Sequence, residues 1–137
     1  MGLKDKKLIS LQEIEGAISP HTKQVDMALK ARKEALEYVT DVSGLAEFIG
    51  GKVESLGVGE DWAISKEIFP GMQVFFIFNR ADDEFASSLK VLFSGNRIRL
   101  MKGEDLAGLV ILYVIHMLRY VRDSNPGKQL PEVCYRV

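Results

Sequence analysis

The sequence predicts an α+β domain, with an antiparallel meander of about four strands packed against a buried C-terminal helix and two N-terminal helices. Three observations support this fold class. Apolar residues recur at helical spacing through residues 19–56, strand-like alternation replaces that period through residues 62–100, and a continuous apolar run of helix length follows at residues 106–118. At 137 residues the chain is long enough to bury its own core, so residues 1–137 are expected to form a single domain.

The first clear helix is expected to begin at Ser19-Pro20. Serine offers a side-chain acceptor to the free amides of a first turn, and proline is favoured at the first helical position, where an N–H is not needed. Apolar residues then lie on one face as far as Val39. Residues 1–18 are expected to be either flexible or a short helix, because Gly16 weakens the helical pattern there.

A second helix is expected from Ser43, with an apolar stripe that continues to Leu56. The Gly50-Gly51 pair is its weak point, since each glycine costs about 1 kcal/mol relative to alanine in a helix interior. The pair therefore indicates either a break in the helix or a place where another part of the backbone comes close.

Four strands are expected next. Residues 62–68 alternate between apolar and polar, residues 72–78 (MQVFFIF) are apolar on both parities, as in a strand covered on both faces, and residues 89–93 alternate again. The Gly-Asn pair at residues 95–96 has the spacing of a type II′ hairpin, which predicts a fourth strand through residues 97–100. Because the connections are short, the pairing is expected to be antiparallel.

The apolar run at residues 106–118 predicts a buried helix and not a membrane span. It contains about 13 residues, whereas a spanning helix needs roughly 20. Glu104 and Asp105 precede it, where acids complement the helix dipole, and Arg119 follows it. Because the run is apolar all round, the helix is expected to be enclosed by other elements. Residues 123–137 are expected to be a tail with an edge strand near its end.

Charge and cysteine content exclude several classes of function. Eighteen Lys and Arg against nineteen Asp and Glu give a formal net charge of -1, so no global field attracts nucleic acid or an anionic membrane. Cys134 is the single cysteine, which excludes an internal disulfide and a multi-cysteine metal or iron–sulfur site. The chain is therefore expected in the reducing cytoplasm, without a cofactor and without a nucleic-acid or membrane partner.

The acids Asp82, Asp83 and Glu84 are the most conspicuous candidate for chemistry. They provide the ligands of a divalent cation or an acid and base pair, yet successive residues point in different directions, and the order of an EF-hand loop is missing. A solvated loop between two strands is the favoured interpretation, and no metal is expected. His116 is expected to be a buried neutral imidazole. Arg97 and Arg99 on one strand face, with Lys90 across the hairpin, are candidates for binding an anion, or are part of a solvated sheet face.

Three short motifs carry a resemblance to a known family: FPG at residues 69–71, DDEFASSLKVLF at residues 82–93 and GEDL at residues 103–106. They resemble the domain-of-unknown-function family 3786, over residues 68–120. This chain has Ser94 where that family often has an aspartate. The resemblance implies a recurring surface, made of these residues: Asp83, Glu84, Phe85, Glu104 and Asp105. It also implies an origin in anaerobic bacteria or archaea, and family members occur beside one-carbon and corrinoid proteins.

Two functions are weighed. The first is a noncatalytic binding or accessory domain, as a homodimer or with another protein partner, that uses an exposed sheet face or an apolar groove beside the last helix; the small-molecule ligand is unknown. The second is a small enzyme whose site collects Asp83, Glu84 and Glu104, together with His116 or Arg97. The enzyme requires these side chains to converge on one pocket, with one carboxylate desolvated. The binding domain is favoured, with Asp83, Glu84, Phe85, Arg97, Glu104 and Asp105 as its candidate binding residues.

Overall fold

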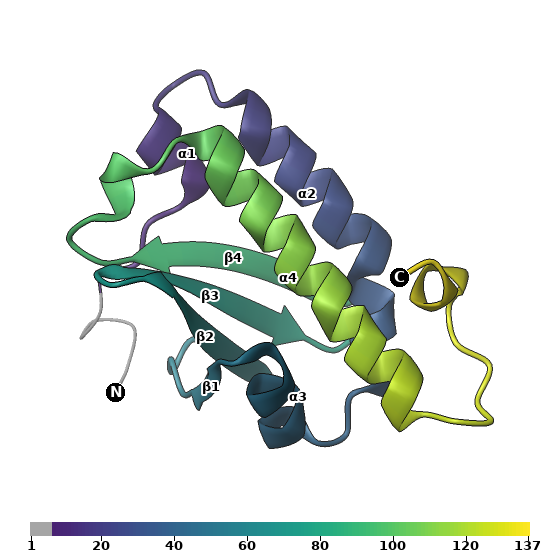
Figure 1. Ribbon diagram of the computed structural model, residues 1–137. Helices are drawn as coiled ribbons and strands as arrows, with labels where there is room; N and C mark the ends of the chain where they lie inside the picture. The colour runs from purple at the N-terminus through teal and green to yellow at the C-terminus, as the bar shows by residue number, and fades with distance from the viewer. Residues whose placement is uncertain (1–6) are drawn as a thin grey trace.

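The computed structural model describes residues 7–137 and has the α+β architecture that the sequence predicts (Figure 1). An antiparallel sheet with strand order β1-β2-β3-β4 lies behind two long helices, α2 and α4. The strands are β1 (Lys52–Glu54), β2 (Trp62–Phe69), β3 (Met72–Asn79) and β4 (Ser88–Ser94). The α-helices are α1 (Leu11–Glu15), α2 (Pro20–Arg32), α3 (Val42–Ile49) and α4 (Gly103–Ser124), and the 3-10 helices are η2 (Lys33–Tyr38), η3 (Ile98–Leu100) and η4 (Glu132–Tyr135).

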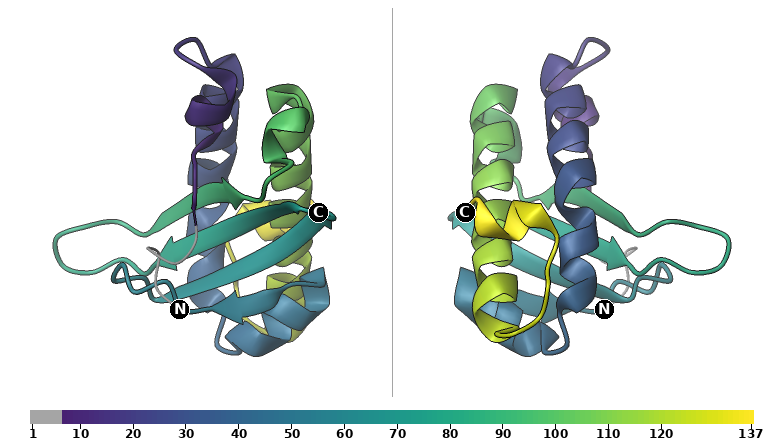
Figure 2. Two further views of the ribbon diagram at one scale, coloured as in Figure 1. Left: turned by 90° about the vertical axis from the view of Figure 1, so that its left-hand side faces the viewer. Right: turned by 90° about the vertical axis from the view of Figure 1, so that its right-hand side faces the viewer.

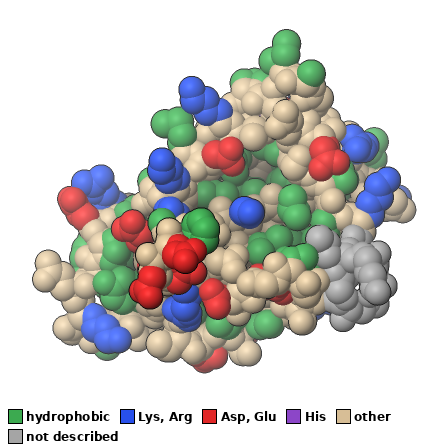
Figure 3. All heavy atoms as spheres, turned by 180° about the vertical axis from the view of Figure 1, so that it is seen from behind, with side chains coloured by type: hydrophobic (Ala, Val, Ile, Leu, Met, Phe, Trp, Pro, Cys, Tyr) green, Lys and Arg blue, Asp and Glu red, His purple; other side chains and the backbone are tan. Residues whose placement is uncertain are grey.

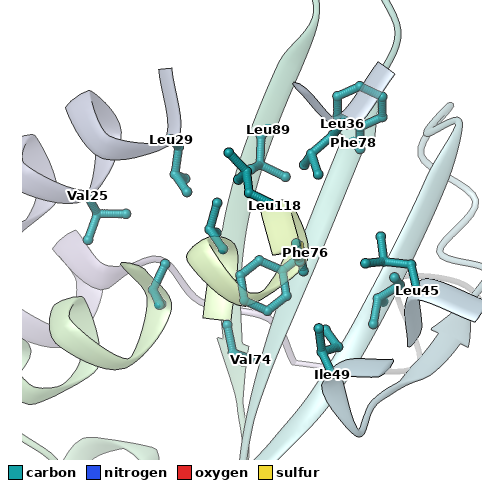
Figure 4. Packing of buried hydrophobic residues seen from close by; sticks show 14 of the residues in the cluster. Val25, Leu29, Leu36, Leu45, Ile49, Val74, Phe76, Phe78, Leu89 and Leu118 are labelled. Carbon is teal, nitrogen blue, oxygen red and sulfur yellow. The ribbon is translucent and has the colours of Figure 1, made fainter. Parts of the chain in front are cut away.

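Strand β3 is the centre of the core, as its two-sided apolar pattern predicts. Val74, Phe76 and Phe78 point toward the helices and pack with residues of α2, η2, α3 and α4 (Figure 4). Phe75 and Ile77 point the other way and join a smaller cluster with Leu56 and Ala63. Figure 3 shows this back of the molecule, where apolar side chains are interspersed with charges of both signs.

The glycine pair at residues 50–51 ends the second helix. Gly50 caps α3 with a left-handed φ of 75°, and a Cβ at Gly51 would clash with the carbonyl oxygen of Ser65 on β2. Both alternatives drawn from the sequence therefore hold: the helix breaks, and another backbone comes close. The expected continuation to Leu56 is wrong, because the chain becomes β1 and pairs with β2.

The predicted fourth strand at residues 97–100 is also wrong. The chain turns at Gly95, where φ is 118°, and continues as the 3-10 helix η3 with Ile98 buried. The predicted hairpin would pair residues 97–100 with β4, but Ile9 takes that edge of β4 through its antiparallel bridge to Phe93. The sheet still has four strands, because β1 takes the fourth place.

Helix α4 spans 22 residues and is buried on one face only. Its buried residues are Leu106, Ala107, Val110, Val114, Met117, Leu118 and Val121. On the opposite face, Leu112 is 55% exposed. The expected enclosure on all sides is therefore wrong, because the sheet and the helices α1, α2, η2, α3 and η4 lie around only part of α4 (Figure 2). Within residues 7–137, no helix combines the length and the apolar character that crossing a bilayer requires.

The two ends of the chain add short elements. Within residues 1–18, for which a flexible segment or a short helix was the expectation, residues 1–6 lie outside the described part and α1 follows, with a capping box between Ser10 and Glu13. The expected edge strand near the end of the tail is wrong, since η4 occupies that place and buries Cys134 against the core.

Candidate functional site

The acidic stretch connects β3 to β4, as the sequence predicts, and lies in solvent. One carboxylate oxygen of Asp82 accepts hydrogen bonds from the backbone N–H groups of Glu84, at 2.9 Å, and Phe85, at 2.7 Å. These bonds, that from Phe85 foremost, hold the pKa of Asp82 below its usual value. Asp83 and Glu84 are exposed, and the Phe85 side chain is 69% exposed. Asp82 therefore orders a turn from within the loop.

The second pair of acids is far from the first. Glu104 and Asp105 lie exposed in the first turn of α4, which follows β4, whereas Asp83 and Glu84 precede β4. The two pairs are thus at opposite ends of one strand, and Figures 1 and 2 show the β3–β4 loop and the start of α4 well apart. The structure does not bring together the acids that the resemblance implies as one surface.

Arg97 is exposed in the turn before η3, where its backbone N–H donates to the carbonyl of Gly71 at 3.2 Å. The anion site suggested for Arg97, Arg99 and Lys90 needs all three on one strand face. That face does not form, because residues 98–100 are a 3-10 helix, and the Arg99 guanidinium donates to the backbone carbonyl of Glu13 at 3.1 Å.

His116 and Cys134 have structural surroundings. The His116 ring is half-buried and meets the Phe48 ring edge-on, with 4.7 Å between centroids, so its expected full burial is wrong. Cys134 is fully buried, and this burial raises the pKa of its thiol, which disfavours the nucleophilic thiolate. Within the described residues, no three His, Cys, Asp or Glu side chains are grouped so that they could hold a metal ion.

A shallow depression of about 760 Å³ adjoins the first half of α4. Its lining comes from α2, from the end of β2, from the connection between η3 and α4 and from α4 itself: His21, Gln24, Phe69, Met101, Glu104, Asp105, Gly108, Leu109 and Leu112. Phe69 is 53% exposed there. The depression lies beside the last helix, where the sequence suggests an apolar groove, and its lining is partly apolar and partly polar, with Glu104 and Asp105 among its residues.

The depression continues onto a helix surface that we call the outer face of α4. Its members follow helical spacing along the side opposite the buried residues: Glu104, Asp105, Gly108, Ile111, Leu112, Ile115 and Arg119. Gly108 has open space around it, Leu112 is exposed, and Ile111 and Ile115 are half-buried. Charged groups stand at the two ends and apolar groups between them.

Glu15 forms a polar cluster beside the depression that the sequence analysis does not find. Its carboxylate accepts from the Ser19 hydroxyl and contacts His21 Nδ1, both at 2.5 Å. The hydrogen bond from Ser19, followed by that from His21, lowers the pKa of Glu15. The expected side-chain cap of α2 by Ser19 is wrong. The Ser19 hydroxyl instead forms hydrogen bonds with Glu15 and Thr22.

The contact between Glu15 and His21 depends on the turn at Gly16, where φ is 99°. That turn folds α1 back toward the start of α2. Glu15 and His21 are six residues apart on either side of it, so helical or strand spacing does not predict their contact. A Cβ at Gly103 would overlap the Glu15 carboxylate, so this cluster also lies against the first residue of α4. It holds His21 in place at the edge of the depression.

Comparison with known protein families matches residues 3–116 to one family, described as "Domain of unknown function (DUF3786)". The comparisons with curated proteins and with solved structures found no match. The family match covers most of the chain, including the sheet, the acidic loop and the first half of α4. The chain therefore belongs to the DUF3786 family of domains of unknown function.

Proposed function

We propose that this chain is a noncatalytic binding or accessory domain that contacts a protein partner through the outer face of α4. The observation that carries the proposal is Leu112, more than half exposed in the middle of the longest helix, with Phe69 exposed beside it across the depression. Because each side chain is about half exposed, leaving it in water forfeits roughly half of the 1.5–3 kcal/mol that full burial contributes. A partner that covers them recovers this free energy.

The composition of the face fits a protein interface. Interfaces have an apolar centre and a polar or charged rim. On α4, the apolar Ile111, Leu112 and Ile115 lie between the acids Glu104 and Asp105 at one end and Arg119 at the other. Grouped apolar side chains on a surface, rimmed by polar ones, mark interaction sites more often than isolated ones do.

The alternative of a small enzyme with a carboxylate-based site loses its support. It requires Asp83, Glu84 and Glu104 to converge with one carboxylate desolvated, whereas all three are exposed and the first two are at the other end of β4 from the third. The arrangement therefore favours contact over chemistry.

The proposal extends to cell compartment and partner class. The single cysteine favours the reducing cytoplasm, where disulfides are rare. The occurrence of family members beside one-carbon and corrinoid proteins in anaerobes favours an accessory role in that metabolism. These statements rest on the cysteine count and on the family, and the proposed contact face does not depend on them.

Photocrosslinking from the outer face tests the proposal. A photoreactive amino acid at Leu112 is expected to give one discrete adduct in extract of the source organism. The same group at Met27, 64% exposed on α2, is the control and is expected to give none. Excess unmodified chain should compete the adduct away, and excess Leu112→Asp chain should not. Equal labelling from both positions, or equal competition by both chains, would contradict the proposed contact face.

A further inference from the structure

We propose that the partner on the outer face of α4 is a second copy of this chain, with the two α4 helices packed antiparallel across a twofold axis. The inference rests on the proposed function, since it names the occupant of the same face. It is drawn from the order of residues along the outer face, which matches a second copy of the same face running in the opposite direction: apolar residues meet apolar residues, and acids meet arginine.

The outer face reads symmetrically about a point between Ile111 and Leu112. In an antiparallel pair of identical helices, residues equidistant from the axis lie opposite each other. Placing the axis at this point sets Ile111 opposite the partner's Leu112, and Gly108 opposite the partner's Ile115. Every apolar residue of the face then meets another apolar residue or a glycine of the second copy.

Gly108 has no role within its own chain that explains it. It lies inside a 22-residue helix, where glycine is less favourable than alanine, and a Cβ there would meet no atom of residues 7–137 within 4 Å. Against a second helix, the missing side chain leaves a notch in which the partner's Ile115 fits. Small residues let helix backbones approach closely, and the 8–10 Å between packed helix axes depends on the side chains at the contact.

The same axis pairs opposite charges. Glu104 and Arg119 are equidistant from it, and Asp105 is one residue closer to the axis than Glu104. Each pair of acids therefore faces the partner's Arg119. Within residues 7–137, none of these three side chains forms an ion pair inside the chain. Because the interface is isologous, the contact occurs twice, about 22 Å apart along the helix at 1.5 Å per residue. A parallel arrangement would oppose acid to acid and arginine to arginine.

The surroundings of the helix leave room for this contact. Figure 1 shows α4 in front of the sheet, with α2 along one side and η4 beyond it. On the outer face of α4, Leu112 is 55% exposed and Gly108 has open space around it. Phe69, beside the first half of α4, extends the apolar area toward the partner.

Light scattering and cysteine crosslinking test the second copy directly. The purified chain is expected at twice the 15.3 kDa of one copy. With an added mild oxidant to accept the two electrons, a Leu112→Cys variant is expected to form an intermolecular disulfide, since residues next to a twofold axis come within the span of that bond. Met27→Cys, at a position on α2 that is more exposed than Leu112, is the control, and the unmodified chain controls for the buried Cys134.

Charge reversal tests the orientation. Arg119→Glu is expected to weaken the dimer by about tenfold or more, because like charges then meet at both ends of the interface. Adding Glu104→Arg and Asp105→Arg to that variant is expected to restore it. Gly108→Gln is expected to weaken the dimer to a similar extent while the monomer stays at least as stable, because glutamine is the better helix former and has open space there.

A chain that stays monomeric throughout the micromolar range would overturn the inference. So would a dimer in which Leu112→Cys crosslinks no better than Met27→Cys, or in which the charge-reversed triple variant is no tighter than Arg119→Glu. If the chain is monomeric and the adduct formed at Leu112 contains a different protein, the second copy is refuted and the proposed function stands. If no competable adduct forms at Leu112 at all, both fail.

Discussion

At the scale of single residues, two glycines with opposite surroundings make a matched test. Gly51 lies where a Cβ would meet the backbone of Ser65, whereas Gly108 has open space. Gly51→Ala is expected to lower the free energy of unfolding by about 1–3 kcal/mol, the usual cost of overpacking. Gly108→Ala is expected to raise it by up to about 1 kcal/mol through helix propensity. Urea unfolding of dilute protein measures both, and equal effects would mean that the backbone at Gly51 yields freely.

Glu15 gives a prediction for acid pH. Hydrogen bonds from Ser19 and then His21 lower its pKa in the folded chain below the usual value of 4.5. A carboxylate with a lowered folded pKa contributes stability above the unfolded value, and that stability is lost as the pH falls through the folded value. Between about pH 5 and pH 3, the unmodified chain should therefore lose more stability than a Glu15→Gln variant. Thermal unfolding across this range measures the difference, and parallel curves would contradict it.

Residue-level expectations succeed where the backbone alone decides. Glycine in a helix interior costs free energy in any fold, so Gly50-Gly51 could be read as a break or a close approach before the neighbouring strand was known. The predicted cap at Ser19 is wrong because the Ser19 hydroxyl has a competing acceptor, Glu15, which only the turn at Gly16 brings near. Side-chain hydrogen bonds across a turn depend on a fold that local sequence does not specify.

At the scale of elements, α4 shows that an apolar sequence does not dictate burial. Leu118 and Leu112 lie on the same helix, one fully buried and one 55% exposed. Leu118→Ala is expected to lower the free energy of unfolding by about 2–5 kcal/mol, because it removes methyl groups and leaves a cavity. Leu112→Ala is expected to change it by less than about 0.5 kcal/mol in dilute monomer. Denaturant unfolding of both variants is the measurement, and a large loss from Leu112→Ala would place that side chain inside the core.

The sheet was predicted with the right number of strands but with one wrong member. Alternation at residues 97–100 suits a strand, yet these residues would have to pair with the edge of β4 that Ile9 occupies, and they form a 3-10 helix. Residues 52–54 follow a helical stripe, yet the break at Gly50 delivers them to the edge of β2. Periodicity reports which side chains share a face, whereas pairing depends on where the neighbouring strand begins and ends.

At the scale of the whole molecule, the topology separates the two pairs of acids that the enzyme hypothesis and the family resemblance bring together. The β3–β4 loop and the start of α4 are joined by a single strand, so their acids are held apart by the length of that strand. The exposure of the outer face of α4 was not predicted, because it depends on which elements pack against the helix. Its apolar members are visible in the sequence, but only the packing of α2, α3, η4 and the sheet shows which side of the helix remains open.

The molecule exposes apolar side chains on α4, the helix that its own core covers on one face only. If a second copy covers this face, the unfolding temperature should depend on protein concentration. Mass action makes the unfolding temperature of a dimer rise with protein concentration. For two chains of this length the rise is expected to be about 2–3 °C for each tenfold increase. Arg119→Glu should reduce the slope, because it weakens the dimer without touching the buried face of α4. Scanning calorimetry at several concentrations measures this, and the same unfolding temperature throughout would mean that α4 keeps its open face in water.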